Sequence, residues 1–106
     1  MISNVLIRHA LKRIAERLCG PFPEDICVLV PSAKTPRVYV ASVPLKCRAA
    51  LHRYLAERIG VSIPHGNDPL ILSATEAMVA IELGEQVRRN DGGAEVVEAE
   101  SGGVFR

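Results

Sequence analysis

Apolar residues recur at helical spacing in the first segment of the chain. The members of this face are separated by four, three and four positions: Ile7, Leu11, Ile14 and Leu18. Such spacing places them on one side of an amphipathic helix, which we predict over residues 2–19. Gly20 and the prolines after it should end the helix, because glycine accepts the left-handed conformation past a last turn and proline cannot continue one.

Two extended segments should follow the first helix. Residues 26–30 form a short continuous apolar run, which predicts a buried strand because the run is too short for an independent helix. After a turn, residues 38–41 resume extended structure, and so short a connection favours an antiparallel hairpin. Pro31 and Pro36 lack the amide proton of a strand ladder, so pairing should be incomplete at the inner ends.

A second helix is predicted from Pro44 to about Ile59, with Gly60 as its stop. We expect residues 61–63 to return as a strand. The passage from residue 38 to residue 63 is long enough for a right-handed parallel crossover. Residues 70–72 add a brief extended segment.

A third helix is expected over residues 74–90. Ser73 and Glu76 have the spacing of a capping box, in which each side chain satisfies a backbone amide near the other residue. Small residues on its apolar face, including Gly84, would permit close packing. The predicted fold is therefore α+β, a small two-layer α/β sandwich in the order α-β-β-α-β-α, with a mixed sheet of three or four short strands.

The domain should span residues 1–90, and the composition changes beyond it. Residues 91–106 are rich in glycine and acidic residues, which predicts a flexible acidic C-terminal tail. The alternative is a short added hairpin, because valines and a Val-Phe pair flank the second glycine-rich turn.

Length and composition narrow the class of protein. A chain of 106 residues is long enough for one core and too short for two. Its apolar runs are far shorter than the roughly 20 residues that a membrane-spanning helix requires, so we expect no membrane association. Three cysteines without a Cys-x-x-Cys pair suit a reducing compartment, which predicts a cytoplasmic location.

Charge is divided unevenly along the chain. Residues 1–60 hold ten Lys/Arg and four acidic residues, a balance of +6, whereas residues 61–106 hold three and eight, a balance of −5. The candidate binding residues are basic positions of the first two helices: Arg8, Lys12, Arg13, Arg48 and Arg53. These faces either contact nucleic-acid phosphates or are solvated helix surfaces, and the scarcity of aromatic residues favours the second interpretation.

Three residues are weak catalytic candidates. His65 and Asp68 lie in a loop after a predicted strand, where they could share a proton, although turn chemistry alone explains residues 66–69. Cys47 lies near the predicted start of the second helix between two basic residues, which would favour a thiolate. Cys27 lies inside an apolar run and is interpreted as a small core residue.

Absent motifs weaken the case for an enzyme. The chain has no nucleophile elbow, no phosphate-binding loop, no dinucleotide fingerprint and no zinc-ligand spacing, so no cofactor or metal is predicted. The leading interpretation is a non-enzymatic protein-interaction or assembly module, a small adaptor that self-associates or docks on a larger protein. The alternatives are a nucleic-acid-binding protein that uses the first two helices, and a small enzyme with its site at His65 and Asp68.

The predicted element order resembles in topology the cytoplasmic domain of type III export switch proteins. The segments that carry the resemblance are Thr35-Pro36-Arg37-Val38 ahead of a helix and Asn67-Asp68-Pro69-Leu70 after a strand. That family depends on an Asn-Pro-Thr-His autocleavage loop. The corresponding segment here, Val30-Pro31-Ser32-Ala33, lacks both the asparagine and the histidine, so the resemblance extends to topology and not to self-cleavage.

Overall fold

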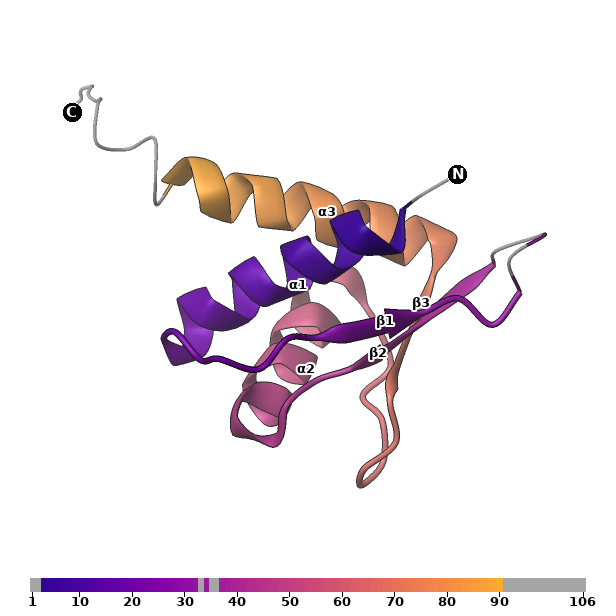
Figure 1. Cartoon of the computed structure of the whole chain (residues 1–106), viewed down its shortest axis with the longest axis horizontal. Coiled ribbons are helices and arrows are strands. Elements are labelled where there is room, and N and C mark those ends of the chain that lie inside the picture. The colour runs from indigo at the N-terminus through magenta and orange to yellow at the C-terminus, as the bar shows by residue number, and fades with distance from the viewer. Residues whose placement is uncertain (1–2, 33, 35–36, 91–106) are drawn as a thin grey trace.

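Three helices and three strands build the domain in the predicted order α-β-β-α-β-α (Figure 1). The computed structural model describes residues 3–32, 34 and 37–90. The elements are α1 (Asn4–Cys19), β1 (Cys27–Leu29), β2 (Val38–Ser42), α2 (Leu45–Ile59), β3 (Leu70–Ser73) and α3 (Ala74–Arg88). The α+β class is confirmed. The expectation of an acidic tail or hairpin over residues 91–106 lies outside the described residues.

The sheet has the order β1-β2-β3 and is antiparallel at both pairings. The predicted hairpin is confirmed, but the parallel crossover and the mixed sheet are wrong. Residues 61–63 form no strand, and β3 begins at Leu70, paired with Ala41 near the end of β2. The chain therefore runs back from the far end of α2 along residues 60–69 and enters β3 in the direction opposite to β2.

Local signals at the helix ends act as predicted. The Ser73 hydroxyl accepts from the Glu76 amide at 3.1 Å, and the Glu76 carboxylate accepts from the Ser73 amide at 2.8 Å, which completes the capping box. Gly20 and Gly60 end their helices with φ values of 82° and 87°, a region that favours glycine. The ends of α1 and α2 and the start of α3 thus follow from residues next to them in sequence.

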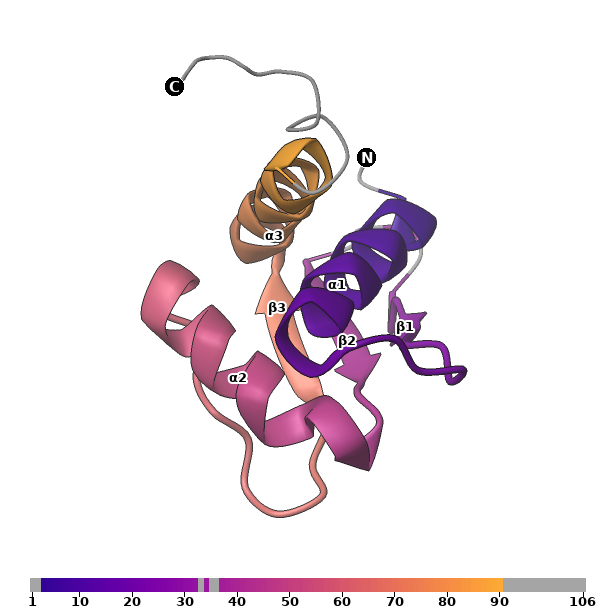
Figure 2. The same cartoon turned by 90° about the vertical axis from the view of Figure 1, so that its left-hand side faces the viewer.

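One face of the sheet packs against the helices. Its side chains alternate along each strand, as period-two structure requires, and all are buried: Val28, Tyr39, Ala41, Leu70 and Leu72. The helices supply the other side of an aliphatic core, with Ile7, Leu11 and Ile14 from α1 and Leu51 and Leu55 from α2. In Figure 2, α1 passes in front of β2, so the other face of the sheet points away from the viewer.

The contact between α1 and α3 depends on a glycine. A Cβ placed on Gly84 would lie 2.7 Å from the Ala10 Cβ and 2.8 Å from the Ala10 Cα. Those distances are shorter than any ordinary carbon contact, so only glycine permits the two helices to approach this closely. Arg13 adds a hydrogen bond from Nη1 to the Gly84 carbonyl oxygen at 3.4 Å. The expected close packing of small residues on the third helix is therefore confirmed.

Two predicted core positions lie at the surface instead. Leu18, assigned to the apolar face of the first helix, is 40% exposed. Cys27 is exposed as well, since β1 is a half-buried strand rather than the fully buried one expected. Within the described ranges, no helix is long and apolar enough to span a lipid bilayer.

Candidate functional site

The predicted basic residues of α1 are directed to different parts of the molecule. Lys12 donates from Nζ to the carbonyl oxygens of Phe22, at 2.9 Å, and Glu24, and its ammonium lies 4.0 Å from the centre of the Phe22 ring. It therefore fastens the segment after α1 to the helix. Arg8, by contrast, is half-buried in the second turn of α1.

Arg13 points to the opposite neighbour, α3. Besides its bond to Gly84, it lies 3.8 Å from the Glu85 carboxylate. That carboxylate also accepts from Arg88 at 2.7 Å, and this hydrogen bond is the main reason that the pKa of Glu85 is lowered. Lys12 and Arg13 thus contact different neighbours rather than contributing to one common basic surface.

Arg48 and Arg53, the predicted binding residues of α2, both line a cavity of about 400 Å³. Arg48 is fixed by two hydrogen bonds, from Nε to the Val43 carbonyl oxygen at 3.2 Å and from Nη1 to the Asn67 Oδ1 at 3.0 Å. Arg53 is exposed at the surface of the same helix. These are the predicted binding residues that the fold brings to one place.

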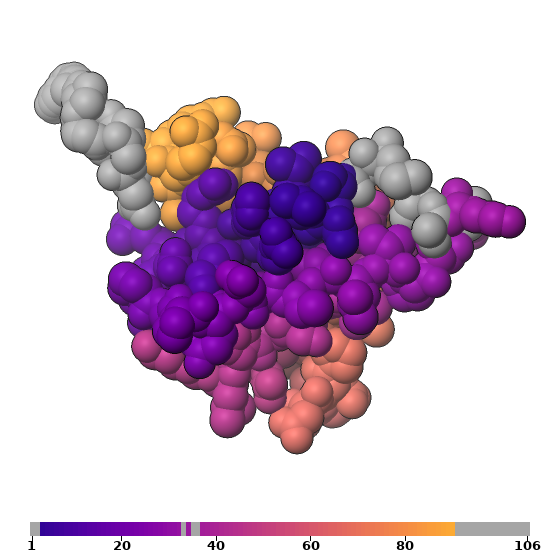
Figure 3. Space-filling view, viewed as in Figure 1, coloured from indigo at the N-terminus to yellow at the C-terminus, as the bar shows by residue number. Residues whose placement is uncertain are grey.

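The His65 and Asp68 loop projects from the lower edge of the molecule, where it stands away from α1 and α3 (Figures 1 and 3). Both residues are exposed, and the Asp68 amide donates to the His65 carbonyl oxygen at 2.9 Å, as in an ordinary turn. Both also line a shallow cavity of about 290 Å³ with Ile63 and Ile71. The turn explains their backbone arrangement, and the hydrogen bond between the two residues joins main-chain atoms rather than their side chains.

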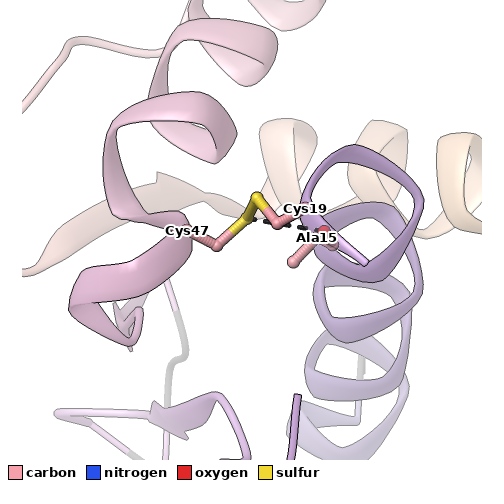
Figure 4. The surroundings of a disulfide bond; sticks show 3 residues. All are labelled: Ala15, Cys19 and Cys47. Carbon is pink, nitrogen blue, oxygen red and sulfur yellow. Dashed lines mark hydrogen bonds between the residues drawn. A yellow bond between two sulfur atoms is a disulfide. The ribbon is translucent and has the colours of Figure 1, made fainter. Parts of the chain in front are cut away.

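Cys47 does not carry the predicted thiolate. Its side chain is buried and forms a disulfide with Cys19, with Cα atoms 6.0 Å apart, which ties the end of α1 to the start of α2 (Figure 4). Its Sγ also lies 3.4 Å from the Ala15 carbonyl oxygen. The nucleophilic interpretation of Cys47 is therefore wrong for the oxidised protein, and the argument from cysteine spacing to a reducing compartment no longer holds.

The open face of the sheet is a site that sequence reasoning missed. The strand register aligns Leu29 with Val40, and Val40 with Ile71, so the three aliphatic side chains form one row across all three strands. Leu29 and Ile71 are 61% and 55% exposed, and Val40 between them is half-buried. We call this row, together with Cys27 and Val38, the open face.

The open face carries no formal charge. Its remaining outward positions on the three strands are Ser42 and Ser73. Antiparallel sheets that face water usually alternate apolar-inward with polar-outward residues, so an aliphatic row on the outward side is unusual. Since the inward and outward residues of β1 are all apolar, alternation in the sequence could not reveal this surface.

The described residues form no metal-binding cluster, and the comparisons with known proteins gave no match. Among residues 3–32, 34 and 37–90, no cluster of three or more histidine, cysteine or acidic side chains could hold a metal ion. No protein-family model, curated protein or solved structure matches the chain. The class defined by fold and surface is an α+β domain with its helices on one side of an antiparallel sheet and an aliphatic row on the other.

Proposed function

We propose that this chain is a non-enzymatic assembly module that self-associates through the open face of its sheet. The observation that carries the proposal is the row Leu29, Val40 and Ile71, which lies exposed across all three strands. Removing such side chains from water is favourable by about 25 cal/mol for each Å² of apolar surface. A second protein surface laid on the row would supply that burial.

A second copy of the chain fits this surface because the open face is uncharged. Two copies related by a twofold axis place the same patch against itself, which brings like charges together wherever a patch is charged. Here the outward strand positions offer only aliphatic, thiol and hydroxyl groups. Sheets packed face to face lie about 10 Å apart with interdigitated side chains, an arrangement that the protruding Leu29 and Ile71 suit.

Pairing by strand edges is less favourable than packing by faces. The outer strands β1 and β3 have only three and four residues. Proline follows shortly after β1, at Pro31, and directly precedes β3, at Pro69. Short edges flanked by proline are common devices against edge-to-edge pairing, which leaves the face as the surface for association.

The other two hypotheses draw less support from the geometry. Nucleic-acid binding would use Lys12, Arg13 and Arg48 together, yet their hydrogen bonds hold them against three different segments rather than on one surface. An enzyme at His65 and Asp68 would need the two side chains to act together, and their hydrogen bond is a main-chain turn.

Light scattering after size-exclusion chromatography tests the proposal. We expect the mass of a dimer for the unmodified chain, and the mass of a monomer for Ile71→Lys, because the new ammonium would be buried without a partner. The matched control is Met78→Lys, since Met78 is equally exposed but lies on α3. A chain that stays monomeric as concentration rises, or a Met78→Lys variant that dissociates like Ile71→Lys, would overturn the proposal.

A further inference from the structure

A cavity of about 400 Å³ lies between α2 and the loop that follows it. The helix contributes positions 45, 48, 49, 52 and 53, a spacing that places all five on one face. The loop contributes Ile63, Pro64, Gly66 and Asn67. Figure 3 shows the loop beside α2 at the lower edge of the molecule. The volume falls within the range of small-molecule sites, roughly 300–1,000 Å³.

The charges around this cavity are all of one sign. Arg48 and Arg53 line it, and none of its lining residues is acidic. The hydrogen bonds of Arg48 to Val43 and Asn67 hold its guanidinium in place, so a ligand would meet an ordered group. Arg53, one turn and a residue further along α2, extends into solvent and can close on a ligand.

The start of α2 adds to the positive potential. The helix begins after Pro44 with no side-chain cap and no acidic residue in its first turn. Its first amides therefore carry a partial positive charge that no carboxylate of that turn offsets. Leu45 and Arg48, which follow Pro44, both belong to the cavity wall, so the start of α2 lies beside the cavity.

His52 is a buried polar residue in the cavity wall. Its side chain is buried and lines the cavity, and its Nε2 has no hydrogen-bond partner in the described part of the chain. A buried polar group without a partner is costly, and native proteins contain few of them. This nitrogen is itself shielded from solvent, so His52 forms part of the cavity wall rather than offering its Nε2 to a ligand.

The remaining wall is aliphatic. Leu45 and Ile63 are 77% and 56% exposed, and Pro64 lies beside them. These side chains can cover the apolar body of a ligand whose polar end lies among the arginines. An inorganic ion would leave them in water, whereas an organic anion would bury them.

We propose that this cavity binds a small organic anion, with its carboxylate between Arg48 and Arg53 and its apolar body against Leu45, Ile63 and Pro64. Guanidinium groups bind carboxylates through paired, charge-assisted hydrogen bonds, which a neutral amide cannot reproduce. The proposal does not depend on self-association, since it uses α2 and its following loop rather than the open face.

A matched pair of probes tests it by NMR chemical-shift titration: 1-naphthaleneacetate and its neutral analogue 1-naphthaleneacetamide. We expect the anion to bind about tenfold more tightly than the amide, with shifts confined to α2 and residues 63–67. Equal affinity of the two probes, or shifts centred elsewhere in the chain, would overturn the proposal. So would an absence of binding by the anion.

Two variants separate the charge from the shape of the site. Arg53→Gln should weaken anion binding about tenfold, whereas Arg58→Gln, which makes the same change of charge on the same helix outside the cavity, should leave it unchanged. Ala49→Leu should exclude both probes, because Ala49 is exposed and lines the cavity. Arg53 is exposed, as Ala49 is, so the Arg53→Gln and Ala49→Leu variants should both fold. Circular dichroism checks this. Equal losses from Arg53→Gln and Arg58→Gln would indicate nonspecific attraction and refute the site.

Discussion

The two faces of the sheet are built from the same strands and nearly the same kinds of residue, yet their exposure differs completely. Leu72 is fully buried, and Ile71, its neighbour in β3, is 55% exposed. Val28 and Leu29 in β1 differ in the same way. The chemistry of a side chain therefore does not decide its role here. Its side of the strand does, because helices cover one face and leave the other exposed.

Replacing the two neighbours in β3 should give the largest contrast. We expect Leu72→Ala to lower the free energy of unfolding by about 2–5 kcal/mol, because it removes buried contacts and leaves a cavity. Ile71→Ala should change the stability of the monomer by no more than about 0.5 kcal/mol. Urea unfolding followed by far-ultraviolet circular dichroism measures both, at a concentration where the protein is monomeric. Similar losses from the two variants would mean that the outward face is also covered within one chain.

The three cysteines extend the comparison to covalent structure. Cys19→Ser should cost about 3–4 kcal/mol, because the disulfide to Cys47 closes a loop with a sequence separation of 28. Cys27→Ser, on the open face, should be nearly neutral and is the matched control. Alkylation of the folded, unreduced protein followed by mass spectrometry should label one thiol. Labelling of all three cysteines would show that the chain had been purified in its reduced form, and the Cys19→Ser loss should then vanish.

The third comparison, between the buried and the exposed histidine, concerns how the free energy of unfolding depends on pH. It should show the smallest of the three effects. Burial, and secondarily the charge of Arg48, lowers the pKa of His52 from its ordinary value of 6.5. The unfolded chain then binds more protons than the folded one below about pH 6.5, so stability falls as the pH drops through and below that value. Urea unfolding at pH values on either side of 6.5 should show a smaller fall in His52→Gln than in the unmodified chain.

His65→Gln is the control for that measurement, because His65 is exposed. It should retain the pH dependence of the unmodified chain. If His65→Gln removed the dependence and His52→Gln did not, the proton uptake would have to be assigned to the loop rather than to α2.

Elements marked by neighbouring residues could be predicted from the sequence. The capping box of Ser73 and Glu76, and the stops at Gly20 and Gly60, depend on groups within a few positions of each other, so a local pattern contains them. Strand pairing, by contrast, is not contained in a local pattern. Residues 61–63 have strand-like composition, but whether such a segment joins a sheet depends on which edge the returning chain reaches.

The open face, the disulfide and the cavity were harder to predict from the sequence, because they too depend on which distant segments the fold brings together. Periodicity could not show that Cys27 and Leu29 point outward, because every residue of β1 is apolar. Nor could spacing pair Cys19 with Cys47, whose contact exists only once α1 and α2 have packed. Arg48 and Arg53 were found by their charge and helical spacing, whereas the aliphatic half of their cavity comes from the loop and needed the fold.

The glycine contact between α1 and α3 also bears on how the domain is made. It joins the first and last helices described, and the bond from Arg13 to Gly84 spans 71 residues. During synthesis, α1 emerges long before its partner, so its apolar side stays without α3 until nearly the whole domain has left the ribosome. Contacts of such long range also slow folding. The nascent chain should therefore depend most on chaperones in the interval before α3 has emerged from the ribosome.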